Sequence, residues 1–87
     1  TLFDQNINVT TFSGTFRNCR ALTNVLQFTF NTNVSTFTQV YNMSSTSNAL
    51  VGTAPEIWNR VPTPAGTDAF NNCVNLTNFA SIPLNFK

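Results

Sequence analysis

Two patterns of hydrophobic and polar positions predict two kinds of element near the start of the chain. Phe12, Phe16 and Cys19 recur at spacings of four and three, which is typical of one face of a short helical segment. In the run 22–30, apolar residues occupy every second position except for Asn24, which favours an extended strand. We therefore expect a helical turn followed by a strand, each with its apolar face directed inward.

This unit is repeated along the sequence. The segment FRNCRALTN at 16–24 matches FNNCVNLTN at 70–78 at six of nine positions, and each copy contains one of the two cysteines. A weaker copy lies between them. It aligns Phe12 with Phe37, Phe16 with Tyr41 and Leu22 with Leu50.

The period of the repeat predicts an α/β fold in the form of a short leucine-rich-repeat solenoid. The leucines of the three copies are 28 and 26 residues apart, within the 20 to 29 residue period of such repeats. We expect one domain over 1–87, with about three coils at 8–33, 34–61 and 64–87, a small parallel sheet, and short helical or 3₁₀ turns opposite it. The expected structural core consists of Phe12, Phe16, Cys19, Leu22, Phe37, Leu50, Phe70, Cys73 and Leu76.

The second coil contains an insertion with clear local helix signals. Thr53 and Glu56 have the spacing of a capping box, and Pro55 falls in the first turn, where its missing N–H is tolerated. These residues predict an inserted helix over about 54–60. The third coil should end in a C-terminal cap that keeps the last apolar layer from water.

Charge and residue types argue against several classes of function. Only seven side chains are charged, the net charge is +1, and the chain has no histidine. Such a surface does not steer phosphates or anionic lipids, so neither nucleic-acid binding nor membrane insertion is expected. Three carboxylates and two cysteines far apart in the sequence do not make a catalytic or metal site. We expect no enzyme activity, no metal and no cofactor.

The two cysteines are expected to remain free thiols. If Cys19 and Cys73 occupy equivalent places two coils apart, stacking at roughly 4.8 Å per layer separates their Cα atoms by about 9 to 10 Å. A disulfide requires less than about 7 Å.

The expected binding surface is uncharged. Asparagine and threonine, with fourteen residues each, supply most of the polar groups. Thr23, Asn24, Thr77 and Asn78 recur at the same place in two coils and could present a hydrogen-bonding surface. Trp58, on the inserted helix, either packs the insertion onto the flank of the solenoid or offers an exposed anchor for a partner.

Several motifs resemble known families of surface proteins. The F-x-x-C-x-x-L-T spacing, with N-V-T-x-F at 8–12 and N-V-S-x-F at 33–37, resembles the BspA-like leucine-rich repeats of bacterial and microbial surface proteins. The segments GTAPEIWNRV at 52–61 and LTNFASIPLNFK at 76–87 resemble the C-terminal portions of bacteriophage tail or prophage proteins. The resemblance implies an extracellular, cell-surface or virion module used in adhesion or ligand binding.

Two functions follow as expectations. The first is a non-catalytic extracellular binding or adhesion module that presents its repeat surface to a protein or glycan on a cell surface. The alternative is a structural component of a phage tail or surface filament that docks on neighbouring chains or subunits. In both cases the chain is expected to be a fragment of a longer protein.

Overall fold

The computed structural model describes residues 2–87, and its regular structure is limited to three short 3₁₀ helices. They are η1 at Ile57–Asn59, η2 at Phe79–Ser81 and η3 at Leu84–Phe86. Elsewhere in the described chain the backbone forms turns and four isolated parallel bridges, with no α-helix, strand or sheet. The prediction of an α/β leucine-rich-repeat solenoid with a parallel sheet is therefore wrong.

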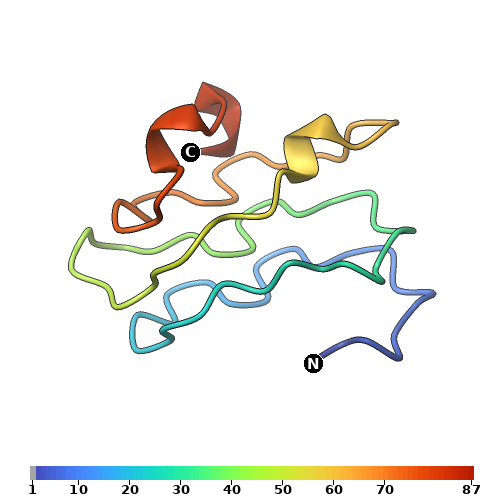
Figure 1. The fold of residues 1–87 in the computed structure, drawn as a ribbon, viewed down its shortest axis with the longest axis horizontal. Helices are drawn as coiled ribbons and strands as arrows, with labels where there is room; N and C mark the ends of the chain where they lie inside the picture. Colours follow the sequence, from blue (N-terminus) through green and yellow to red (C-terminus); the bar gives the residue numbers. More distant parts are fainter. Residues whose placement is uncertain (1) are drawn as a thin grey trace.

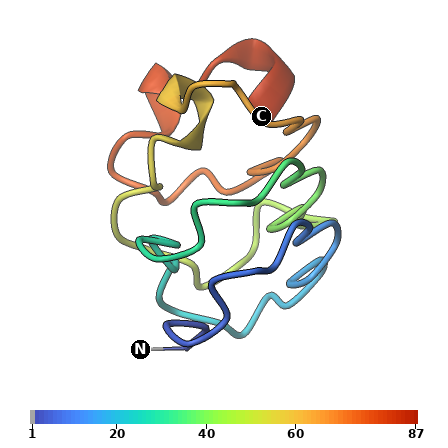
Figure 2. The ribbon, with the colours of Figure 1, turned by 90° about the vertical axis from the view of Figure 1, so that its right-hand side faces the viewer.

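Backbone hydrogen bonds instead hold segments of the chain side by side in layers (Figure 1). The N–H of Phe12 donates to the carbonyl of Thr36, and the N–H of Phe37 donates to that of Ala65. The same pairing continues along each segment, so 10–19, 35–44 and 64–73 run in parallel. We call these the first, second and third layers. Figure 2, turned by 90°, shows the N-terminus at one end of the stacked layers and the C-terminal helices at the other.

A second side of the molecule joins the same layers. Asn24 forms a parallel bridge with Val51, and Gly52 forms one with Leu76. The N–H of Val51 donates to the carbonyl of Thr23 at 2.9 Å. Each layer therefore continues from its first side into a second segment, and these segments also lie next to one another.

Left-handed residues at matching positions explain why no helix or strand forms on the first side. Gly14, Gln39 and Asp68 have φ of 66°, 57° and 56°, and they occupy corresponding places in the three layers. A residue in this region fits neither a right-handed helix nor an extended strand. In the stretch 12–19, alternate N–H groups consequently donate to the next layer rather than to the carbonyl four residues back. The predicted helical turn is a series of tight turns.

The predicted strand over 22–30 is also absent. Its only bridge is at Asn24, and Phe28 adopts a φ of 56°, which ends the extended path. The expected alternation fails as well, because Phe28 is buried while Leu22 and Phe30 are 36% and 54% exposed.

The prediction of an inserted helix over 54–60 is wrong except for the single 3₁₀ turn η1. The capping box does not form, because the hydroxyl of Thr53 lies 2.7 Å from that of Thr77. The side-chain amide of Asn78 accepts the N–H of Ala54 at 2.9 Å and donates to its carbonyl at 3.1 Å. These bonds hold the backbone at Ala54 to the third layer, outside any helix.

The core is built around stacked aromatic rings. The ring of Tyr41 stacks on Phe16 at 5.0 Å and on Phe70 at 6.2 Å, one ring from each layer. Phe12 and Phe37 stack beside them at 6.1 Å. Of the residues expected in the core, the structure buries Phe12, Phe37, Leu50, Phe70, Cys73 and Leu76.

The other three expected core residues are partly exposed: Phe16, Cys19 and Leu22. All three lie toward the N-terminal side of the molecule, where the ring of Phe3 packs 6.2 Å from that of Phe16. Within residues 2–87, no segment pairs with the first layer on that side as the second layer does on the other. Burial here depends on a neighbouring layer and not on the repeat motif alone.

The C-terminal helices cover the third layer. The N–H groups of Asp68 and Phe70 donate to the carbonyls of Asn85 and Phe86. The Phe86 ring fills the space beside Gly66 that a Cβ atom would need. An aromatic ring from η3 thus takes the place that the side chain of residue 66 would occupy.

Candidate functional site

Most of the expected binding residues lie on the second side of the molecule. The bridges between Asn24 and Val51 and between Gly52 and Leu76 bring Thr23 and Asn24 to the same side as Thr77 and Asn78. The exposed side chains of this side form what we call the Asn/Thr face: Thr23, Asn24, Val51, Thr53, Asn75 and Thr77.

The members of the Asn/Thr face differ in what they can offer a ligand. Within residues 2–87, the side chains of Thr23 and Asn24 make no hydrogen bond. The hydroxyl of Thr77 is shared with Thr53, and the Asn75 amide donates to the carbonyl of Asn48 at 3.1 Å. Thr23 and Asn24 therefore have their full hydrogen-bonding capacity available.

Asn78 and Trp58 serve the fold in this structure. Both polar ends of the Asn78 side chain are bonded to the backbone of Ala54. Trp58 packs edge-on against Phe70 and Phe86, with ring centroids 6.4 and 6.1 Å apart. Of the two interpretations of Trp58, the structure therefore shows packing, against the third layer and η3.

The electrostatic character of the Asn/Thr face is neutral. None of its six side chains ionises at ordinary pH. Val51, 48% exposed, places an aliphatic group between the amides of Asn24 and Asn75. Such a surface can exchange hydrogen bonds with neutral groups and contact apolar ones, but it supplies no countercharge for an anion.

The two thiols are in different surroundings, and both are free. The buried Cys73 thiol donates to the carbonyl of Tyr41 at 3.1 Å, and burial raises its pKa to about 12. Cys19 is partly exposed in the first layer. Burial also raises the pKa of Tyr41 to about 12, while its hydroxyl accepts the N–H of Leu26 at 3.0 Å. Of the two thiols, Cys19 is therefore the one that a reagent in solution can reach.

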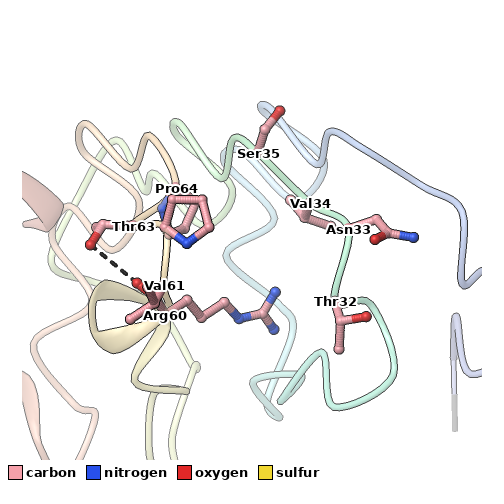
Figure 3. A pocket seen from close by; sticks show the side chains of 9 residues that line it. Thr32, Asn33, Val34, Ser35, Arg60, Val61, Thr63 and Pro64 are labelled. Atoms are coloured by element: carbon pink, nitrogen blue, oxygen red, sulfur yellow. Dashed lines mark hydrogen bonds between the residues drawn. The ribbon is translucent and has the colours of Figure 1, made fainter.

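A groove of about 300 Å³ lies between the segments 32–35 and 60–64 (Figure 3). Figure 3 shows the Arg60 side chain reaching across toward the Thr32 segment, with Thr63 bonded to the Arg60 carbonyl at 3.2 Å. Pro62, Pro64 and the exposed Val61 form one wall. The groove therefore combines a guanidinium with apolar and hydroxyl-bearing walls.

The guanidinium of Arg60 is already occupied by the protein. It donates to the carbonyls of Asn31 at 2.7 Å and Phe28 at 2.9 Å, and it lies 5.1 Å from the centre of the Phe37 ring. Burial lowers its pKa. These contacts make Arg60 a structural cation, so the groove is a weaker candidate for ligand binding than the Asn/Thr face.

The role of Arg60 repeats one layer earlier. The side-chain amide of Asn31 donates to the carbonyls of Phe3 and Asn6, both at 3.0 Å. Asn31 and Arg60 are 29 residues apart and each closes the turn beneath it. Sequence reasoning missed this pair. The sequence feature that could have indicated it is a side chain with several N–H donors at the matching turn of two successive repeats.

Within residues 2–87, no three His, Cys, Asp or Glu side chains gather as a metal site requires. Over the same residues, no helix has the length and apolarity needed to cross a bilayer.

Comparison of the chain with protein-family models, with curated proteins and with solved structures finds no match.

Proposed function

We propose that the protein is a non-catalytic binding module of an extracellular, cell or virion surface, and that it binds through the Asn/Thr face. The observation that carries this proposal is the pair Thr23 and Asn24, exposed and without side-chain hydrogen bonds. Exposed polar side chains with no internal role are free to serve recognition.

The chemistry of the face favours a neutral ligand, either a protein surface or a glycan. Amide and hydroxyl groups can both donate and accept, so they match sugar hydroxyls or peptide groups. Val51 adds an aliphatic patch of the kind that contacts the apolar face of a ligand. We therefore expect binding to depend only weakly on salt.

The test is a binding screen of the folded protein on arrays of glycans and of cell-surface proteins. We expect a ligand whose binding falls by at least tenfold, about 1.4 kcal/mol, in Asn24→Arg and Val51→Arg variants, because both place a long charged side chain on the face. Thr67→Arg is the matched control, since Thr67 is exposed on the opposite side. Equal loss in all three variants, or no loss in any, would contradict the proposal.

The alternative function is a structural component of a phage tail or surface filament that docks on neighbouring chains. The partly exposed apolar residues of the first layer favour it, because Phe16 and Cys19 are less covered than the equivalent Phe70 and Cys73 of the third layer. An assembled neighbour would supply that cover.

A further inference from the structure

We propose that the N-terminal face of the molecule binds an extended segment of a partner protein chain, which adds to the protein as one more layer. This inference deepens the alternative function above and is independent of the Asn/Thr face. The N-terminal face consists of the backbone carbonyls of Thr11, Ser13 and Thr15 and the side chains of Phe16, Cys19 and Leu22.

Along the first side, most backbone hydrogen bonds between layers run from an N–H of one layer to a carbonyl of the next. In the second and third layers, carbonyls at alternate residues accept N–H groups from the layer on their N-terminal side. These acceptors are Thr36, Thr38 and Val40 in the second layer, and Ala65, Thr67 and Ala69 in the third. The corresponding carbonyls of the first layer, at Thr11, Ser13 and Thr15, have no partner within residues 2–87. They form a row of acceptors with the same spacing.

Two copies of one apolar sequence triplet differ in how far they are buried. In the third layer, Phe70, Cys73 and Leu76 are at most 4% exposed. The matching side chains of the N-terminal face are partly exposed, with Leu22 at 36%. They line a shallow hollow of about 680 Å³ together with residues 18–21. Leu22 matches Leu76 in the sequence only, because the bridges place Val25 beside Gly52 and Leu76. Phe16 and Cys19 do match Phe70 and Cys73, and they stay partly exposed although the Phe3 ring lies 6.2 Å from that of Phe16, so this part of the core is incompletely covered.

The row of carbonyls restricts what can bind to the N-terminal face. A row of carbonyls spaced for alternate N–H groups is matched by a polypeptide backbone, as in peptides that add to a sheet edge. Two copies placed face to face would oppose carbonyl to carbonyl. The other end of the molecule cannot supply the donors, because the N–H groups of Asp68 and Phe70 are already bonded to Asn85 and Phe86. A polypeptide segment with free N–H groups matches the row, and the occupant that we propose is such a segment of a partner protein.

Two positive charges at the edge of the N-terminal face favour a partner segment with acidic residues. Arg17 and Arg20 are exposed at the C-terminal end of the carbonyl row, where the second layer has the uncharged Asn42. In a partner segment that runs parallel to the first layer, the residues beside Arg17 and Arg20 come after the aromatic residue that enters the hollow. The best partner segment thus has alternate free N–H groups, an aromatic side chain for the hollow, and acidic residues following it.

The test uses Cys19 as a built-in reporter of the covered face. The probe is a synthetic peptide with the sequence of residues 35–44 followed by two glutamates. Its amides at the positions of Phe37, Gln39 and Tyr41 would meet the carbonyls of Thr11, Ser13 and Thr15. We expect the peptide to slow modification of Cys19 by a thiol reagent about tenfold once about nine tenths of the protein is occupied.

Two matched controls separate backbone recognition from non-specific masking. A peptide N-methylated at the positions of Gln39 and Tyr41 keeps both side chains but loses two donors, and it should give no protection. In the protein, Leu22→Glu should abolish protection, whereas Val74→Glu, at an exposed valine of the third layer, should leave it intact.

The inference is overturned if the peptide never protects Cys19, or if the N-methylated peptide protects it equally. It is also overturned if raising the protein concentration alone protects Cys19 and sedimentation shows a dimer, because a second copy would then cover the face. None of these outcomes bears on the Asn/Thr face, which is tested separately by the array variants.

Discussion

Replacing Tyr41 with alanine is expected to lower the free energy of unfolding of the protein by a large fraction. Tyr41 is fully buried, and its ring contacts those of Phe16 and Phe70, so it links all three layers. Removing a buried aromatic side chain costs roughly 3–5 kcal/mol. Small domains are stable by only about 5–15 kcal/mol, so the loss removes a large share of the total. Urea denaturation followed by circular dichroism measures it.

The matched control is Tyr41→Phe, which keeps the ring and removes the hydroxyl that accepts the Leu26 N–H. Leaving that donor without a partner costs about 1–3 kcal/mol, so this variant should fold with a lower urea midpoint. A Tyr41→Ala protein with an unchanged midpoint would mean that the ring does not lie between the layers.

The second large effect is expected for Gly66→Ala. The new Cβ would overlap the ring of Phe86, which is only 2% exposed and cannot swing into solvent without leaving the core. Forcing an extra methyl into such a contact costs about 1–3 kcal/mol. Thermal unfolding should therefore begin at a lower temperature in this variant.

A double-mutant cycle shows whether the clash is the cause. In a Phe86→Ala background the space beside Gly66 is open, so adding Gly66→Ala should cost much less than it does in the unmodified protein. If the two destabilisations simply add, residue 66 and the Phe86 ring do not touch, and η3 does not cover the third layer in the way described.

Part of this architecture could be read from the sequence because it depends on the repeat. The alignment of Phe16 with Tyr41 and Phe70 rests on shared aromatic residues, and these rings are stacked in the structure. Contacts between layers of this kind appear in the sequence as residues that recur at the period of the repeat.

The local elements could not be read in the same way. A spacing of four residues fits one turn of a helix, but it also fits two steps of an alternating backbone, which is what residues 12–19 adopt. Gln39 and Asp68 adopt the left-handed conformation that Gly14 adopts at the matching position, and their side chains do not predict it. The helix signals at 53–56 failed because Asn78, far along the chain, binds the backbone at Ala54.

For the candidate site, too, the repeat predicts the position of the residues but not their contacts. The repeat predicts that Thr23 and Asn24 share one side with Thr77 and Asn78, and the bridges place them on one side. The register differs from the prediction, because Asn24 lies level with Val51 and Asn75 and not with Asn78. The use of each side chain depends on contacts across layers, so Asn78 is engaged while Asn24 is free. The exposure of Leu22 has a different origin, because the bridges on the second side shift the register by three residues relative to the repeat and Leu22 does not take the place of Leu76.

The most direct test of the layered arrangement is a set of long-range nuclear Overhauser contacts in isotopically labelled protein. The structure requires contacts of the Phe16 N–H with Val40 and of the Tyr41 N–H with Ala69, together with contacts of the Tyr41 ring to both Phe16 and Phe70. Observation of all of these would establish the parallel pairing of the three segments. Helical contacts within 12–19, without any contact between Phe16 and Tyr41, would contradict it.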